Sequence, residues 1–315
     1  MARVWILGSG LIGGGWAASF AAGGHDVTVI DPDPTAAPRL EVLWRDAFAA
    51  MRRTGRAVGT PPLPGLAVSP QQAGSAPDWV QESLPEKLDL KRSVFAGLEP
   101  FLRDDTIIAS SSSGLSPDDM ATALAVPGRL VIAHPCNPSH LMPVVELCGG
   151  SQTTALVMEQ ATVLFEGLGK TVLRMNKPMP GHLVNRLQAA LWREAVHLAS
   201  EGVASLGDIE RAVTLGLAPR WTIIGPSTVF HVSGGEGGME RFLEALGPEF
   251  ERWWATLGAP SLDAQTRKVL VEGMAEADPR PVHEIAAARD VALTGLMALL
   301  EAGVHRKSSS GGEEQ

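Results

Sequence analysis

Short apolar runs alternate with longer amphipathic stretches through the first half of the chain. The runs cover residues 4–7, 27–30, 79–81, 106–109, 130–133, 144–147 and 170–173. Between several of them, apolar residues recur at helical spacing, notably over 37–53, 86–98 and 153–168. Short strands that alternate with helices predict a mostly parallel sheet with helices on both faces.

The pattern changes at the segment NKPMPG, residues 176–181, which separates two kinds of sequence. Beyond it we find helical spacing over 183–201, 206–215, 239–257, 262–274 and 285–300, and no convincing strand. We therefore predict an α/β domain over 1–179 and an all-α domain over 180–305. The polar, Gly/Ser-rich tail over 306–315 is expected to be disordered.

A glycine-rich segment follows the first apolar run. It consists of Gly8, Ser9, Gly10, Leu11, Ile12 and Gly13. Gly8 allows a tight turn, Gly10 lets backbone amides approach a pyrophosphate, and Gly13 lets the next helix pack close to the sheet. A second apolar run then ends in Asp31. Strand, glycine turn, helix, strand and acid in this order predict a Rossmann-type dinucleotide site.

Asp31 bears on which dinucleotide is bound. A carboxylate at the end of the second strand accepts hydrogen bonds from the adenosine ribose and repels a 2′-phosphate. Pro32, Asp33 and Pro34 follow it, and the next arginine is Arg39. These residues favour NAD over NADP, whereas FAD uses the same fingerprint and stays open at this point.

Composition and charge narrow the class of protein. Of the 315 residues 45% are hydrophobic, and the formal net charge of -9 argues against a general nucleic-acid partner. The two cysteines, Cys136 and Cys148, fit a reducing compartment. The sequence shows neither a signal peptide nor an apolar run near the about 20 residues that span a bilayer. We expect a soluble, cytoplasmic protein without a membrane partner.

Polar residues stand where strands of the first domain end. Ser110 to Gly114 follows one strand, His134 follows the next, and Glu146 interrupts an apolar run. A lone histidine at a strand end is usually structural, and a carboxylate between apolar residues needs a partner. Asn185 lies early in the first helix of the second half. Cys136 and His140 near His134 do not make a convincing metal site, because prolines interrupt the cluster.

Several segments together resemble the L-3-hydroxyacyl-CoA dehydrogenase family. They are GSGLIGGGWA (8–17), QESLPEKLDLK (81–91), SSSSGL (110–115), HPCNPSHLMPVVEL (134–147) and LVNRLQAALWREAVHL (183–198). The resemblance extends to about residue 275. It implies an NAD-dependent enzyme that oxidises a C3 hydroxyl to a ketone and associates as a homodimer through its helical half.

The resemblance also implies roles for particular residues. His134 would be the general base, with Glu146 orienting its imidazole. Ser113 and Asn185 would hydrogen-bond the reacting oxygen of the substrate. The family pattern places Glu82, Lys87, Ser113 and Asn137 close to the cofactor. Lys87 departs from the asparagine often found at its position, so its role is open.

The substrate is less firmly indicated than the reaction. The segment GLAPRWTIIGP (216–226) is similar to branches of the family that act on free L-gulonate or L-carnitine, and its Arg220 could bind a carboxylate. This favours a small L-3-hydroxy acid such as L-gulonate. The alternatives are L-carnitine, whose trimethylammonium would need aromatic faces, and a CoA thioester held by the arginines between Arg39 and Arg56. The aromatic candidates are Trp192, Trp221, Phe230, Trp253 and Trp254.

The alternative hypothesis is that the protein has a non-enzymatic function. An NAD-binding protein of this type could serve as a structural, crystallin-like protein or as a sensor. His134 and Glu146 are both present, which favours the enzyme. NADH formation with a panel of 3-hydroxy acids distinguishes the two.

Overall fold

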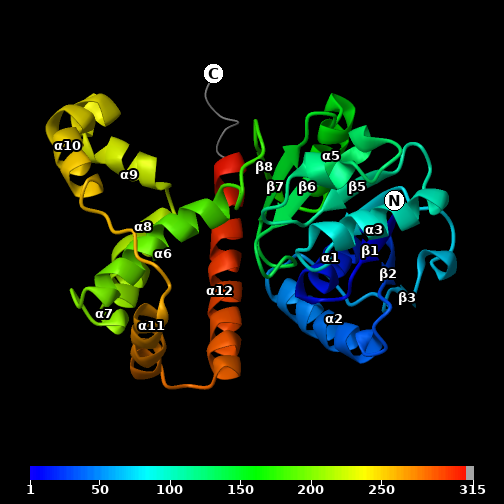
Figure 1. The fold of residues 1–315 in the computed structure, drawn as a ribbon, viewed down its shortest axis with the longest axis horizontal. Coiled ribbons are helices and arrows are strands. Elements are labelled where there is room, and N and C mark those ends of the chain that lie inside the picture. Colours follow the sequence, from blue (N-terminus) through cyan, green and yellow to red (C-terminus); the bar gives the residue numbers. More distant parts are fainter. Residues whose placement is uncertain (310–315) are drawn as a thin grey trace. The chain divides into compact units, whose positions relative to one another are not determined.

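A computed structural model describes residues 1–309 of the chain, with side-chain environments over residues 1–300. The chain divides into two compact units, one formed by residues 1–186 with the chain from 286 onward, the other by residues 187–285 (Figure 1). The predicted division at residue 179 lies just before the first junction. The last helix belongs to the first unit, which a division drawn along the sequence does not show.

The first unit is built on one eight-stranded sheet. Its strands are β1 (Arg3–Leu7), β2 (Asp26–Ile30), β3 (Gly65–Ala67), β4 (Trp79–Glu82), β5 (Ile107–Ser110), β6 (Leu130–Pro135), β7 (Val144–Gly149) and β8 (Thr171–Arg174). They lie in the order β3-β2-β1-β4-β5-β6-β7-β8, and every pair is parallel except β6 with β7. The Rossmann-type, mostly parallel sheet expected from the apolar runs is confirmed.

Helices cover both faces of this sheet. Those that alternate with its strands are α1 (Leu11–Ala22), α2 (Ala36–Arg53), α3 (Leu88–Leu98), α4 (Pro117–Ala121) and α5 (Ala155–Gly167). Successive strand residues point to opposite faces, so Val4 packs in one buried cluster with Trp16 of α1, and Trp5 packs in another with Phe95 of α3. The central strands are buried on both sides, which is why they read as continuous apolar runs.

The remaining helices follow the sheet in sequence. They are α6 (Val184–Ser200), α7 (Leu206–Arg211), a π-helical turn (Ala212–Leu217), α8 (Ala218–Trp221), α9 (Pro226–Ser233), α10 (Gly238–Trp254), α11 (Ala264–Ala277) and α12 (Val282–Ser309). Residues 187–285 contain no strand, so the all-α second half is confirmed. None of the helices in the described chain is both long and apolar enough to cross a bilayer.

Two details of the helical half differ from the sequence prediction. The helix expected over 206–215 ends at Arg211 and continues as a π-turn, because Pro219 has no amide to donate four residues back and a regular helix cannot run through it. Helix α12 continues to Ser309, so the tail predicted to be disordered from residue 306 is helical where it begins. The rest of that predicted tail, 310–315, lies outside the described residues.

Candidate active site

A cleft of about 710 Å³ lies at the carboxyl ends of β1, β2 and β4. The glycine segment Gly8–Ile12 lines it, together with Asp31 and Arg39. Gly8 has φ +91, a value that L side chains rarely adopt, so the turn needs a glycine. A Cβ at Gly13 would lie 1.9 Å from the Gly8 carbonyl oxygen, which gives Gly13 its close-packing role.

Gly10 fits the role of a pyrophosphate neighbour. A Cβ built on it would meet nothing within 4 Å, so its open face adjoins the cleft. Gly10 is also the N-cap of α1, and no side chain caps the first amides of that helix. Unpaired amides and the positive end of the helix dipole favour an anion here. The residues of this cleft therefore fit the dinucleotide predicted from the sequence.

Asp31 lies at the edge of the same cleft and is 9% exposed. Its Oδ2 accepts hydrogen bonds from the Ser9 amide (2.8 Å) and the Ser9 hydroxyl (2.6 Å), and its Oδ1 accepts from the Asp33 amide (2.9 Å). Burial alone would raise the pKa of this carboxyl, but these hydrogen bonds and Arg39 together lower the pKa. Asp31 is thus held as a carboxylate at the edge of the cleft.

Arg39 contacts Asp31, although the sequence analysis treated it as too distant along the chain to do so. It lies in the first turn of α2, and its guanidinium reaches back to Asp31 Oδ2 (3.2 Å) and Asp33 Oδ2 (2.9 Å). The same group donates to the Ser9 hydroxyl at 2.7 Å. The first basic residue after the acid therefore contacts the acid directly, although eight positions separate them in the chain.

His134 and Glu146 form a buried pair at the carboxyl end of β6. They are opposite each other in the antiparallel β6–β7 register, so both side chains stand on the same face. His134 Nδ1 lies 2.7 Å from Glu146 Oε2, and the two residues are 8% and 1% exposed. The structure thus brings together the two residues that the sequence assigns to proton transfer.

Glu146 is held by more than the histidine. Its Oε1 accepts from the backbone amides of Leu183 (2.7 Å) and Val184 (2.9 Å), where α6 begins. Burial would raise the pKa of the Glu146 carboxyl, but the hydrogen bonds from His134 and the two amides outweigh it and lower that pKa. An ionised, fully hydrogen-bonded carboxylate favours the tautomer in which His134 carries its proton on Nδ1.

His182 is a second histidine at this point that the motifs did not single out. Its ring centroid lies 5.1 Å from that of His134, and the residue is 2% exposed. His182 Nε2 lies 2.9 Å from the Ser112 carbonyl oxygen, whereas its Nδ1 has no hydrogen-bond partner in the described structure. Its φ of 48 marks it as a special backbone position. Its place three positions before Asn185 was the only sequence signal.

The serine loop after β5 is held by Glu86, which the sequence reasoning did not select. Glu86 Oε1 accepts from the Ser112 hydroxyl (2.6 Å) and from the Ser113 and Gly114 amides (3.0 Å each). The Ser113 carbonyl in turn accepts from the Gly181 amide at 3.0 Å. Ser113 is therefore fixed beside the start of α6, where Asn185 stands half-buried in the first helical turn.

Three residues predicted to lie near the cofactor differ in burial and in location: Glu82, Lys87 and Asn137. Glu82 is fully buried, and its carboxylate binds Lys91 Nζ (2.6 Å) and the Leu84 amide (2.6 Å). Leu84, whose amide it binds, lines the cleft. Lys87 is exposed at the N-cap of α3, and Asn137 is exposed after β6. Lys91, a buried lysine paired with Glu82, was not selected from the sequence because a partner nine positions away gives no motif.

Arg220 lies in the second unit, on α8, and is exposed. It forms no ion pair with any residue described, including the acids Glu236 and Glu240 of the same unit. Among the aromatic candidates, Trp192 is 51% and Trp254 64% exposed. Phe230 packs within an aromatic cluster of the same unit, stacked on Phe242 at 4.8 Å between ring centroids.

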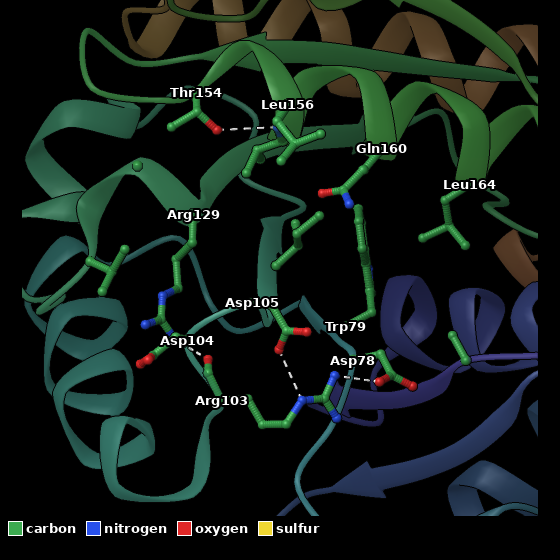
Figure 2. Close-up of a pocket in the computed structure, with 15 residues that line it drawn as sticks. Asp78, Trp79, Arg103, Asp104, Asp105, Arg129, Thr154, Leu156, Gln160 and Leu164 are labelled. Atoms are coloured by element: carbon green, nitrogen blue, oxygen red, sulfur yellow. Dashed lines mark hydrogen bonds and ion pairs between the residues drawn. The ribbon is translucent and has the colours of Figure 1, made fainter.

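A different cavity, of about 500 Å³, lies at the opposite, amino-terminal edge of the sheet. Figure 2 shows its lining, in which Arg103 is joined to Asp78 (2.5 Å) and Asp105 (2.9 Å). None of the predicted site residues lines it. In parallel α/β sheets ligands bind at the carboxyl edge, so this cavity is not the candidate active site.

The geometry defines a class of protein: a Rossmann-type protein with a dinucleotide-shaped cleft and a buried His–Glu pair at the same edge of the sheet. The family model for the NAD-binding domain of 3-hydroxyacyl-CoA dehydrogenase matches residues 3–178, and that for the C-terminal domain matches residues 181–267. The chain belongs to the 3-hydroxyacyl-CoA dehydrogenase family and is an NAD-dependent dehydrogenase.

The chain is also similar to individual enzymes and to solved structures. The chain is 43% identical to an L-carnitine dehydrogenase of Streptomyces coelicolor over 291 residues, 91% of each chain, and 38% identical to one of Pseudomonas aeruginosa over 297 residues, 93% of this chain and 92% of the relative. Among solved structures, 5-formyl-3-hydroxy-2-methylpyridine 4-carboxylic acid 5-dehydrogenase has a TM-score of 0.83 at 26% identity, covering 95% of this chain and 98% of its own.

Proposed function

We propose that this enzyme oxidises the C3 hydroxyl of L-carnitine to the ketone with NAD. The observation that carries the reaction is the buried His134–Glu146 pair, at the same sheet edge as the dinucleotide cleft. The substrate rests on the relatives, which are L-carnitine dehydrogenases at 36% to 43% identity over most of the chain. L-carnitine therefore replaces L-gulonate as our first choice, although both are small L-3-hydroxy acids.

The proposed proton transfer follows from the hydrogen bonds of the pair. Because Glu146 accepts a hydrogen bond from the Nδ1–H group of His134, the lone pair on His134 Nε2 is left free to take the proton of the C3 hydroxyl. The imidazolium that forms is stabilised by the carboxylate at 2.7 Å. The glycine segment Gly8–Ile12 and Asp31 would hold NAD, whose nicotinamide would supply the acceptor for the C3 hydride. Ser113 and Asn185 are proposed to hydrogen-bond the reacting oxygen.

We assign the substrate carboxylate to Arg220. Its guanidinium is exposed and has no carboxylate partner among the described residues. The π-turn Ala212–Leu217 directly precedes its helix, and such turns are frequent at functional sites. An arginine fork matches a free carboxylate bidentately. The trimethylammonium would be met by exposed tryptophan faces of the helical half, for which Trp192 and Trp254 are the candidates.

We also propose a homodimer formed through the helical half. Large apolar side chains of the second unit are widely exposed, among them Leu187 (70%), Leu215 (72%), Ile223 (74%) and Val271 (70%). An isolated protein rarely leaves so many in water. Light scattering at micromolar concentration should report a dimer, and a monomer would contradict the proposal.

The substrate is tested by NADH formation at 340 nm with L-carnitine, L-gulonate, L-3-hydroxybutyrate and L-3-hydroxybutyryl-CoA. We expect the highest kcat/KM for L-carnitine. A higher value for the CoA thioester would overturn the free-acid proposal and turn attention to the arginines of α2. No turnover of any of the four, by a protein that binds NADH, would favour a structural or sensing role.

A further inference from the structure

The ribose end of the cofactor cleft holds a guanidinium between two carboxylates. Arg39 contacts Asp31 through Nη2 (3.2 Å) and Asp33 through Nη1 (2.9 Å), and it lines the cleft with both. Its side chain is 37% exposed. Its Nε is buried and has no partner in the described structure. The ribose end of the cleft therefore contains a positive charge, whereas the sequence alone predicted only the carboxylates there.

We propose that Arg39 is a second determinant of cofactor choice, a latent site for the 2′-phosphate of NADP that Asp31 and Asp33 keep closed. The acid at the end of β2 is normally taken to exclude that phosphate by itself. In this chain the three side chains carry two negative charges and one positive charge within one cluster. Arg39 is turned toward the carboxylates and its charge is compensated, so it is not available to an anion.

Asp33 is as firmly engaged as Asp31, which is why both acids enter the proposal. One Asp33 oxygen accepts from the Thr35 amide and the Thr35 hydroxyl, at 2.8 Å each, and the other accepts from Arg39. These contacts, the Arg39 hydrogen bond first, lower the pKa of Asp33 to about 2. Asp33 therefore stays negatively charged and keeps holding Arg39 when Asp31 alone is replaced.

Ser9 completes the latent site. Its hydroxyl accepts from Arg39 Nη2 at 2.7 Å and donates to Asp31 at 2.6 Å. If the acid is removed, the guanidinium, the Ser9 hydroxyl and the Ser9 amide are left as donors around one position at the cleft edge. Donors of this kind, with arginine foremost, are those that bind phosphate.

The test measures binding, so it does not depend on the substrate or on turnover. We compare the dissociation constants of NADH and NADPH, from quenching of protein fluorescence, for wild type, D31S, D31S/D33N and D31S/D33N/R39L. The Asp33→Asn change keeps the side-chain oxygen that caps Thr35. The double variant should bind NADPH about tenfold to a hundredfold more tightly than wild type, as expected for one charge-assisted hydrogen bond. D31S alone should gain less.

The R39L change in the double variant should abolish the gain. If NADPH binding by the triple variant stays within about twofold of the double variant, Arg39 is not the phosphate ligand and the proposal is wrong. It is equally wrong if the double variant folds and gains no NADPH affinity.

A single variant keeps the question answerable if the double variant fails to fold. R39L alone should raise the ratio of the dissociation constants of 2′,5′-ADP and AMP, because the local cation that offsets the two acids is lost. R45L is the matched control, since Arg45 lies on the same helix, is 72% exposed and pairs with Asp46. Equal ratios for R39L and R45L would overturn the proposal.

Discussion

Glu146→Gln tests the proton-transfer pair with the smallest possible change in shape. The carboxylate uses one oxygen for the Leu183 and Val184 amides and the other for His134. A glutamine can keep its carbonyl oxygen on the two amides, which leaves its NH₂ group facing the histidine. His134 must then accept on Nδ1 and carry its proton on Nε2, so it can no longer take a proton from the substrate.

The size of the effect follows from this tautomer change. Loss of a positioned general base costs about 10²–10⁴ in kcat, and we expect the variant to fall in that range. The fold should persist, since the two amide hydrogen bonds remain and a neutral hydrogen bond replaces the charge-assisted one to His134, which contributes about 1.5–3 kcal/mol. NADH affinity should not change, because Glu146 does not line the dinucleotide cleft.

The assay is NADH formation with L-carnitine between pH 6 and 10, with the NADH dissociation constant measured on the same samples. Glu159→Gln is the matched control, because Glu159 is 63% exposed and pairs with Arg174 on the surface of the first unit. A Glu146→Gln variant that retains kcat within about threefold of wild type, at any pH in this range, would refute the proposed pair.

Three further predictions address the substrate, the core and the glycine turn. Arg220→Met should lower kcat/KM for L-carnitine by one to two decades, about 1.5–3 kcal/mol, with NADH binding intact; an unchanged kcat/KM would exclude a carboxylate contact. Lys170 is 6% exposed, and its burial lowers its pKa to about 7. The folded state then binds this proton less tightly than the unfolded state. Burial of the charged lysine therefore lowers the stability of the fold by its full amount below about pH 7. This loss shrinks as the pH rises to 10.5, the ordinary pKa of lysine. The free energy of unfolding, measured in urea, should therefore rise between about pH 7 and 10.5. Lys170→Met should remove this rise, and the control Lys177→Met, at an exposed position, should keep it. Gly13→Ala should lower the free energy of unfolding by about 1–3 kcal/mol or more, because its Cβ would lie 1.9 Å from a backbone oxygen. Gly97→Ala is the control, since a Cβ there meets open space and should not destabilise α3.

Sequence periodicity predicts the sheet well because burial on both faces leaves a continuous apolar run. Each of the seven runs corresponds to an observed strand. The strand it misses, Gly65–Ala67, has only three residues at the sheet edge, and only Ala67 among them is buried. The antiparallel direction of β7 was also not readable, since an apolar run carries no direction.

The candidate site is predictable where a motif specifies it and not where a contact is made in space. The glycine segment, Asp31, His134 and Glu146 all stand in contiguous patterns. By contrast, Glu86 and Lys91 act through partners that the fold brings to them. Arg39 shows the same limit, because its proximity to Asp31 depends on the direction in which α2 leaves β2.

The pairing of β6 with β7 has a consequence for how this enzyme can diverge. His134 and Glu146 are opposite each other in the strand register, so the hydrogen-bonded ladder of the sheet sets their separation. The connecting residues, 136–143, do not set that separation; Ser139 anchors them by donating to the Ile12 carbonyl at 3.1 Å, and its own carbonyl accepts from Lys170 Nζ at 2.5 Å. Insertions or deletions there should change the shape of the neighbouring surface while the proton-transfer pair stays in place. A shift of the register by a single residue, in contrast, would send one of the two side chains to the other face of the sheet. The separation of the pair therefore depends on the register of the two strands and not on the length of the loop between them.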